Sequence, residues 1–109
     1  MTRPQRKMNG RSARKIHPGD ILREEFLKPL KMSSYELAKK LCVPPPRIND
    51  IVLEKRGISA DTAVRLAKFF RTTESFWMSL QAFYELRSAR DRLAKELDRI
   101  QPHRSKTAA

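Results

Sequence analysis

The sequence predicts an all-α fold, and three observations support that prediction. Apolar residues recur at steps of three and four through most of residues 21–100, as they do along one face of a helix. Serine or threonine stands before three of these periodic segments, where helix N-caps are found. Almost no stretch alternates apolar and polar residues in the manner of a half-buried strand. With 109 residues, the chain is long enough for one compact domain with tails.

The boundaries of the first two helices can be placed from proline and from capping residues. The first helix is expected to end near Lys28, because Pro29 disfavours helical backbone at the residue before it. The second helix begins with a capping box, since Ser33 and Glu36 stand three residues apart ahead of an apolar face.

Three consecutive prolines, Pro44 to Pro46, mark the start of a third helix. The first amide groups of a helix have no intrahelical acceptor, so the missing proton of proline costs little there. The preceding letters LCV then form a short turn, and two short helices joined in this way make a helix-turn-helix. The same pair can also occur in a small helical bundle that binds no DNA. After the third helix, KRG supplies a turn in which Gly57 can take a positive φ.

A fourth helix follows Ser59 as its N-cap, and a fifth begins at a threonine cap in TTESFW. A sparser apolar stripe then continues through a heavily charged C-terminal segment. The predicted organisation is a flexible basic arm at 1–15, a five-helix helix-turn-helix domain at 16–84, and a C-terminal charged helical extension with a tail at 85–109.

Charge favours an anionic partner such as nucleic acid. Lysine and arginine number 24 against 12 acidic residues, which gives a formal net charge of +12. Residues 1–16 hold six basic residues and no acidic ones, whereas residues 17–100 hold 16 basic and 12 acidic residues, a balance of +4. Half of the excess charge therefore lies in the predicted arm, which can grip phosphates even when it is disordered.

Several other classes of protein do not fit. No apolar run approaches the roughly 18 residues of a membrane span, and the basic N-terminus lacks a secretory signal, so a cytoplasmic protein is expected. One cysteine and two histidines offer no disulfide and no zinc spacing. No paired nucleophile or phosphate loop is visible, so neither an enzyme nor a cofactor is expected. Cys42 is expected to be a small buried hydrophobe.

The N-terminal residues of the third helix are candidates for contacts with base edges, as in other recognition helices. Arg47 suits guanine, and Asn49 suits adenine. Pro45 and Pro46 can make only apolar contact, for instance with a thymine methyl. Asp50 could accept from cytosine or could simply orient Arg47.

Phosphate contacts are expected from residues at the ends of the two helices. Ser34 begins the second helix, while Lys55 and Arg56 follow the third. Such contacts fix the position of the protein without reading sequence. RNA binding through the basic arm is an alternative, but the major groove of A-form RNA is too narrow for a helix.

Five segments together resemble a known family: HPGDILREEFLKPL, SSYELAKKL, RINDIV, KRGISADTAVRLAKFF and TTESFWMSLQAFYELR. In order and spacing they are similar to the HigA (VapI-like) antitoxins, a branch of the lambda-repressor-like, XRE-type helix-turn-helix proteins. The combination of HPGDIL with FWMSLQ is distinctive. The resemblance covers about residues 16–90. It implies a homodimer that binds operator DNA, represses its own operon and neutralises a HigB-type RNA-cleaving toxin. A stand-alone XRE-type regulator without a toxin partner is the alternative.

One departure from the family lies in the turn of the helix-turn-helix. Similar sequences usually have glycine in an LGV turn, where this chain has Cys42. If that position needs a positive φ, Cys42 is mildly strained.

The segment FWMSLQAFY predicts a dimer interface. It carries more large apolar side chains than one helix of a small domain can bury on a single face. Trp77 is expected to belong partly to the domain core. Leu80, Phe83 and Tyr84 are the residues expected at the dimer interface.

Overall fold

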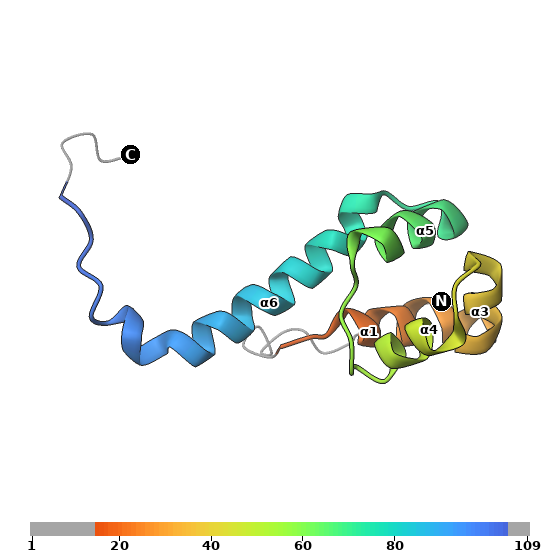
Figure 1. Ribbon diagram of the computed structural model, residues 1–109, viewed down its shortest axis with the longest axis horizontal. Helices are drawn as coiled ribbons and strands as arrows, with labels where there is room; N and C mark the ends of the chain where they lie inside the picture. The colour runs from red at the N-terminus through yellow and green to blue at the C-terminus, as the bar shows by residue number, and fades with distance from the viewer. Residues whose placement is uncertain (1–14, 105–109) are drawn as a thin grey trace, which may run out of the picture.

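The structure, a computed structural model, describes residues 15–104, and every regular element within them is helical. Figure 1 shows α1, α3, α4 and α5 gathered into a body from which α6 runs outward. The helical segments α1, η1 and α2 follow one another without a break and together form the first helix. Residues 15–104 therefore contain the five predicted helices, which confirms the all-α fold. The elements in order are α1 (Pro18–Ile21), the π-helix η1 (Leu22–Leu27), α2 (Lys28–Leu30), α3 (Ser34–Leu41), α4 (Pro45–Val52), α5 (Ala60–Phe70) and α6 (Glu74–Leu97).

The first helix continues past Pro29 to Leu30, so the expectation that it ends near Lys28 is wrong. Its turns before the proline are π-helical, and the Lys28 amide donates to the Arg23 carbonyl five residues earlier. In an α-helix, proline lacks an amide proton and its ring clashes with the carbonyl four residues back. The wider π-turn changes this spacing, which lets the helix continue through Pro29 to Leu30.

Three N-caps lie where the sequence predicts them. The Ser33 hydroxyl accepts from the Glu36 amide at 3.0 Å, and the Glu36 carboxylate accepts from the Ser33 amide at 2.9 Å. Ser59 and Thr73 begin α5 and α6 in the same way, each accepting from an amide three residues later. These bonds satisfy amides that have no acceptor within the helix, so they fix where α3, α5 and α6 start.

The three prolines begin α4 as predicted. Pro44 is the N-cap, with extended backbone at φ −64° and ψ 141°, and Pro45 and Pro46 occupy the first turn. Because Pro44 cannot join a helix in this conformation, the chain turns sharply between α3 and α4.

Cys42 ends α3 in the left-handed conformation, with φ 60° and ψ 45°. The strain expected for a residue with a β-carbon at this position is therefore present. The expectation that Cys42 is buried is wrong, because its side chain is exposed. Its position just beyond the last turn of α3 directs the side chain away from the core.

The turn after α4 takes its positive φ at Glu54 (φ 63°), so the expectation for Gly57 is wrong. Gly57 is needed for a different reason. A β-carbon there would lie 2.6 Å from the amide nitrogen and oxygen of the Gln81 side chain. Gln81 is buried, and its Oε1 accepts from the Ile58 amide at 2.7 Å. Glycine thus allows the turn to pack closely against α6.

Trp77 joins α6 to the core, where it was expected to lie in part, and its side chain is fully buried. Its ring centroid lies 4.9 Å from that of Phe26 and 6.1 Å from that of Phe70. The indole N–H donates to Thr72 Oγ1 at 2.7 Å, so burying its one polar group leaves no donor unpaired. The other buried hydrophobic residues come from the first four helices and their turns: Leu22, Leu27, Leu37, Ala38, Leu41, Val43, Ile48, Ile51, Ile58, Ala63, Leu66 and Ala67.

Helix α6 crosses the predicted boundary between residues 84 and 85 without interruption. The division into arm, domain and extension stays a prediction, and residues 1–14 of the arm lie outside the described residues. Between residues 15 and 104, no helix is both long enough and apolar enough to cross a bilayer.

Candidate nucleic-acid interface

Helices α3 and α4 form the predicted helix-turn-helix pair, and Figure 1 shows them side by side. Leu37 and Ala38 of α3 and Ile48 and Ile51 of α4 are fully buried in the shared core. The core therefore fixes α4 from one side, which leaves the other side of the helix to solvent.

The exposed side of α4 carries the residues predicted to contact bases. Pro45, Pro46 and Asn49 are exposed, and Arg47 and Asp50 are half-buried. All five therefore present some surface at or near the N-terminal half of α4. Their contact with bases stays a prediction.

A hydrogen bond joins α3 to the face of α4 that is predicted to contact bases. Ser34 Oγ donates to Asn49 Oδ1 at 3.2 Å. The bond restrains the Asn49 side chain and leaves both protons of its amide nitrogen free to donate. Ser34, predicted as a phosphate contact, thus also orients a residue predicted to contact a base.

Arg47 reaches across to the first turn of α5. Its Nη1 donates to Asp61 Oδ1 at 2.6 Å, and the same oxygen accepts from Arg65 Nε at 2.7 Å. Hydrogen bonds from Arg65 and then Arg47 hold the pKa of Asp61 below its ordinary value. Asp61 is not among the residues that the sequence predicts at this surface. The four-residue step from Asp61 to Arg65 was visible on the predicted helix, but the pairing with Arg47 depends on how α4 and α5 pack.

Asp50 contacts Arg56 rather than Arg47, with 3.6 Å between the carboxylate and guanidinium atoms. The suggestion that Asp50 orients Arg47 is therefore wrong: Arg47 turns toward α5, and Asp61 takes that role. Lys55 is exposed and follows α4 closely, because its amide donates to the Asp50 carbonyl at 2.7 Å. Lys55 and Arg56 lie at the opposite end of α4 from Pro45.

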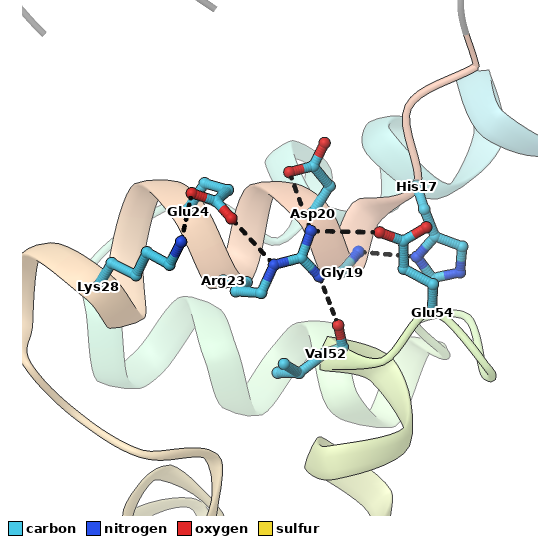
Figure 2. Close-up of polar contacts among 8 residues, drawn as sticks. All are labelled: His17, Gly19, Asp20, Arg23, Glu24, Lys28, Val52 and Glu54. Carbon is cyan, nitrogen blue, oxygen red and sulfur yellow. Dashed lines mark hydrogen bonds and ion pairs between the residues drawn. The ribbon is translucent and has the colours of Figure 1, made fainter. Parts of the chain in front are cut away.

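The C-terminal end of α4 is held by Arg23 of the first helix (Figure 2). Arg23 Nη1 donates to the Val52 carbonyl at 2.6 Å. Its Nη2 donates to Glu54 at 3.3 Å and to Asp20 at 3.4 Å. Its Nε donates to Glu24 at 3.0 Å, so one guanidinium bridges the first helix and the end of the recognition helix.

The first helix lies directly against α4. A β-carbon on Gly19 would overlap the Ile51 carbonyl oxygen, so glycine is required by this close approach. His17 is the N-cap, and its Nδ1 accepts from the Gly19 amide at 2.8 Å. Burial lowers the pKa of His17, which favours the neutral ring that can accept this bond. The ring also packs edge-on against Tyr84 of α6, 4.7 Å between centroids.

The three residues predicted at the dimer interface differ in exposure. Leu80 is half-buried against the core, and Tyr84 is half-buried beside His17. Phe83 is 69% exposed. Two of the three side chains thus already pack within the chain, and the interface stays a prediction.

In residues 15–104, no group of three His, Cys, Asp or Glu side chains could hold a metal ion. The geometry described above instead resembles a surface that contacts a polyanion: an exposed helix end, two side chains fixed by hydrogen bonds, and cations at the far end of α4.

Comparison with known proteins supports this interpretation. The helix-turn-helix family model matches residues 24–77. Virulence-associated protein I of Dichelobacter nodosus is 54% identical over 74 residues, which cover 68% of each chain. An HTH-type transcriptional regulator of Escherichia coli strain K12, YbaQ, is 40% identical over 86 residues, covering 77% of this chain and 76% of its own.

A solved structure gives a likeness of the same kind. The Pseudomonas aeruginosa antitoxin HigA with the higBA promoter superposes with a TM-score of 0.80 at 49% identity, covering 82% of this chain and 98% of that one. Fold, residue spacing and overall sequence agree, and so this chain belongs to the HigA antitoxin family of helix-turn-helix proteins.

Proposed function

We propose that this chain binds operator DNA by inserting α4 into the major groove and thereby represses its own operon. One observation carries the proposal: Arg47 and Asn49 are held by Asp61 and Ser34 on the outer side of a helix whose inner side is buried. Restrained polar side chains of these two types suit guanine and adenine edges. The likeness to an antitoxin solved with promoter DNA supports the same conclusion.

The remaining predicted contacts complete this surface. Pro45 and Pro46 offer apolar contact to bases, and Asp50 lies one turn further along α4. Lys55 and Arg56 contact phosphates beyond the C-terminal end of the helix, and Ser34 does so at the start of α3. Phosphate contacts supply affinity that depends on salt, whereas base contacts supply the preference for one sequence.

Binding is tested with a duplex from the chain's own promoter and a scrambled duplex of equal composition, by fluorescence anisotropy at fixed salt. We expect the promoter duplex to bind at least about 1,000-fold more tightly, as specific sites do. Equal affinities would contradict the proposal. An RNA hairpin that competes as well as the promoter duplex would favour the RNA-binding alternative.

We also infer that the chain acts as a dimer. An operator palindrome needs two recognition helices about 34 Å apart, and each chain has one. On α6, apolar residues at 83, 86, 93 and 97 follow heptad steps and lie on the side opposite Trp77. Phe83, Leu86 and Leu97 are 69%, 50% and 44% exposed. This stripe can be covered by the same helix of a second copy. Of the three residues predicted at the interface, Phe83 belongs to the stripe, whereas Leu80 packs against the core and Tyr84 against His17.

Phe83→Glu is expected to give a folded monomer that binds promoter DNA weakly. The matched control is Lys95→Glu, which puts the same carboxylate on the opposite side of α6. Sedimentation velocity at micromolar concentration measures the state of each variant. If Phe83→Glu remains a dimer, the interface does not lie on this stripe of α6.

The family relationship further suggests that the chain neutralises a HigB-type RNA-cleaving toxin. The product of the adjacent gene should co-purify with this chain, and co-expression should restore growth that the product alone arrests. Resemblance to YbaQ, named as a transcriptional regulator, supports the second candidate, a regulator without a toxin. No growth arrest and no complex with the adjacent gene product would favour that candidate.

A further inference from the structure

We propose that Asp61 is a positioning residue that sets sequence preference by holding Arg47 in the orientation needed to read a base. This inference rests on the proposed binding of operator DNA. Asp61 itself lies on α5, outside the helix-turn-helix pair.

Asp61 is also restrained by a second arginine, Arg65. Its Oδ1 accepts from Arg65 Nε at 2.7 Å, and Arg65 Nη1 donates to the Leu41 carbonyl at 2.8 Å. Leu41 is the last residue of α3, so the bonds run from α3 through Arg65 and Asp61 to Arg47 on α4. Although the Asp61 side chain is 56% exposed, its position is therefore defined by two helices.

The bond to Asp61 leaves Arg47 able to bind DNA. A guanidinium has five N–H donors in a fixed plane, and Asp61 accepts from Nη1 alone. A guanine presents two acceptors in the major groove, which the remaining donors can satisfy. Arginine has many rotamers, and fixing it in the free protein lowers the ordering cost of binding.

Asp61 also acts through its charge. A carboxylate beside α4 repels the phosphates of any duplex, promoter or scrambled, about equally. Loss of this charge should therefore tighten binding to both duplexes alike. Only the promoter duplex also loses the contact of an oriented Arg47, so the ratio of the two affinities should fall.

The test compares wild type with Asp61→Ala on promoter and scrambled duplexes. We expect the ratio of the two affinities to fall by about tenfold, a coupling usual for contacting residues, with tighter binding to the scrambled duplex. The control is Glu74→Ala, because Glu74 is an exposed acidic residue in the first turn of α6, as Asp61 is in the first turn of α5. Glu74→Ala should leave the ratio unchanged.

A double mutant separates positioning from a general effect on the fold. In an Arg47→Ala background, Asp61→Ala should lower the ratio no further, because its action passes through Arg47. An equal tenfold fall in that background would overturn the inference, as would an unchanged ratio in the single mutant. If Asp61→Ala does not fold, Asp61→Leu keeps a side chain of similar size without an acceptor for Arg47, and its ratio must still fall. A wild type that prefers no sequence would instead overturn the proposed function.

Discussion

The guanidinium of Arg23 donates to the carbonyl oxygen of Val52 at 2.6 Å, which ties the first helix to the last turn of α4. Carbonyls in the last turn of a helix have no intrahelical donor, so this bond satisfies a group that would otherwise need water. Arg23 makes its other bonds to Asp20, Glu24 and Glu54, which restrain it from three sides (Figure 2). The recognition helix is therefore held at its C-terminal end by one side chain and at its N-terminal end by Asp61.

Replacing Arg23 with alanine should destabilise the fold by about 1.5–3 kcal/mol, the range for hydrogen bonds to charged groups. The destabilisation comes from the Val52 carbonyl, which is left without its donor. Urea unfolding followed by circular dichroism measures the change. Arg92→Ala is the control, because Arg92 is exposed on α6 away from the apolar stripe, and it should change stability by less than about 0.5 kcal/mol. Equal effects of both substitutions would show that Arg23 does not anchor α4.

Asn49→Ala should cost about 1–3 kcal/mol in binding the promoter duplex and nothing in binding a scrambled one. Its amide nitrogen has free donors, and its orientation is set by Ser34. The comparison is Lys55→Ala, at a predicted phosphate contact. This substitution should weaken binding to both duplexes about equally. Anisotropy titrations on the two duplexes distinguish these patterns. If Asn49→Ala lowers the affinity for both duplexes equally, Asn49 does not contact a base.

The features predicted correctly from sequence are those determined by a few neighbouring residues. The capping box of Ser33 and the proline start of α4 depend on bonds within a single turn, so the residue types identify them. The left-handed backbone at Cys42 could be anticipated only by resemblance to chains with glycine there.

The features that sequence did not predict depend on how separate helices pack. Arg47 and Asp61 are 14 residues apart and Arg23 and Val52 are 29 apart, and nothing local specifies either pair. The π-helical turns before Pro29 were missed for a related reason. Whether a helix ends at a proline or widens before it depends on how the residues on either side of the proline pack. Here their packing favours a helix that continues through Pro29.

Deleting residues 1–14 should weaken DNA binding and make it less dependent on salt. The segment carries five cations, and the slope of log K against log salt becomes shallower by about 0.9 for each phosphate that the shortened chain no longer neutralises. Affinities measured between low and moderate salt give this slope. A variant of full length with glutamine at the five positions is the control for chain length: Arg3, Arg6, Lys7, Arg11 and Arg14. An unchanged slope in both would mean that the segment does not touch DNA.

Folding stability should fall between about pH 7 and pH 5 because of His17. Burial lowers its pKa, Glu54 raises it, Arg23 lowers it, and Asp20 raises it; the net shift is downward. The unfolded chain, with a histidine pKa near 6.5, therefore takes up more protons than the native state as pH falls. The contribution of neutral His17 to folding stability is thus present above that pH and lost below it. Protonation also removes the lone pair that accepts from the Gly19 amide.

His17→Asn provides the test, because asparagine can accept the same amide bond but does not titrate. Urea midpoints measured from pH 5 to 7.5 should decline toward low pH in the wild type and remain flat in this variant. His103 is exposed and lies beyond α6, so His103→Asn should keep the wild-type slope. If the slope disappears in His103→Asn and persists in His17→Asn, His17 is not the source of the pH dependence.

Cys42→Gly should stabilise the fold by about 1 kcal/mol. Cys42 has φ 60°, a conformation that costs a residue with a β-carbon roughly 1–2 kcal/mol and costs glycine nothing by sterics. Glycine loses more backbone freedom on folding, which offsets part of this gain. The exposed thiol makes no buried contact that the substitution would remove. Lys40→Gly, inside α3 and exposed, is the control and should lose about 1 kcal/mol. If both glycines lower the urea midpoint, the left-handed position is not the source of strain.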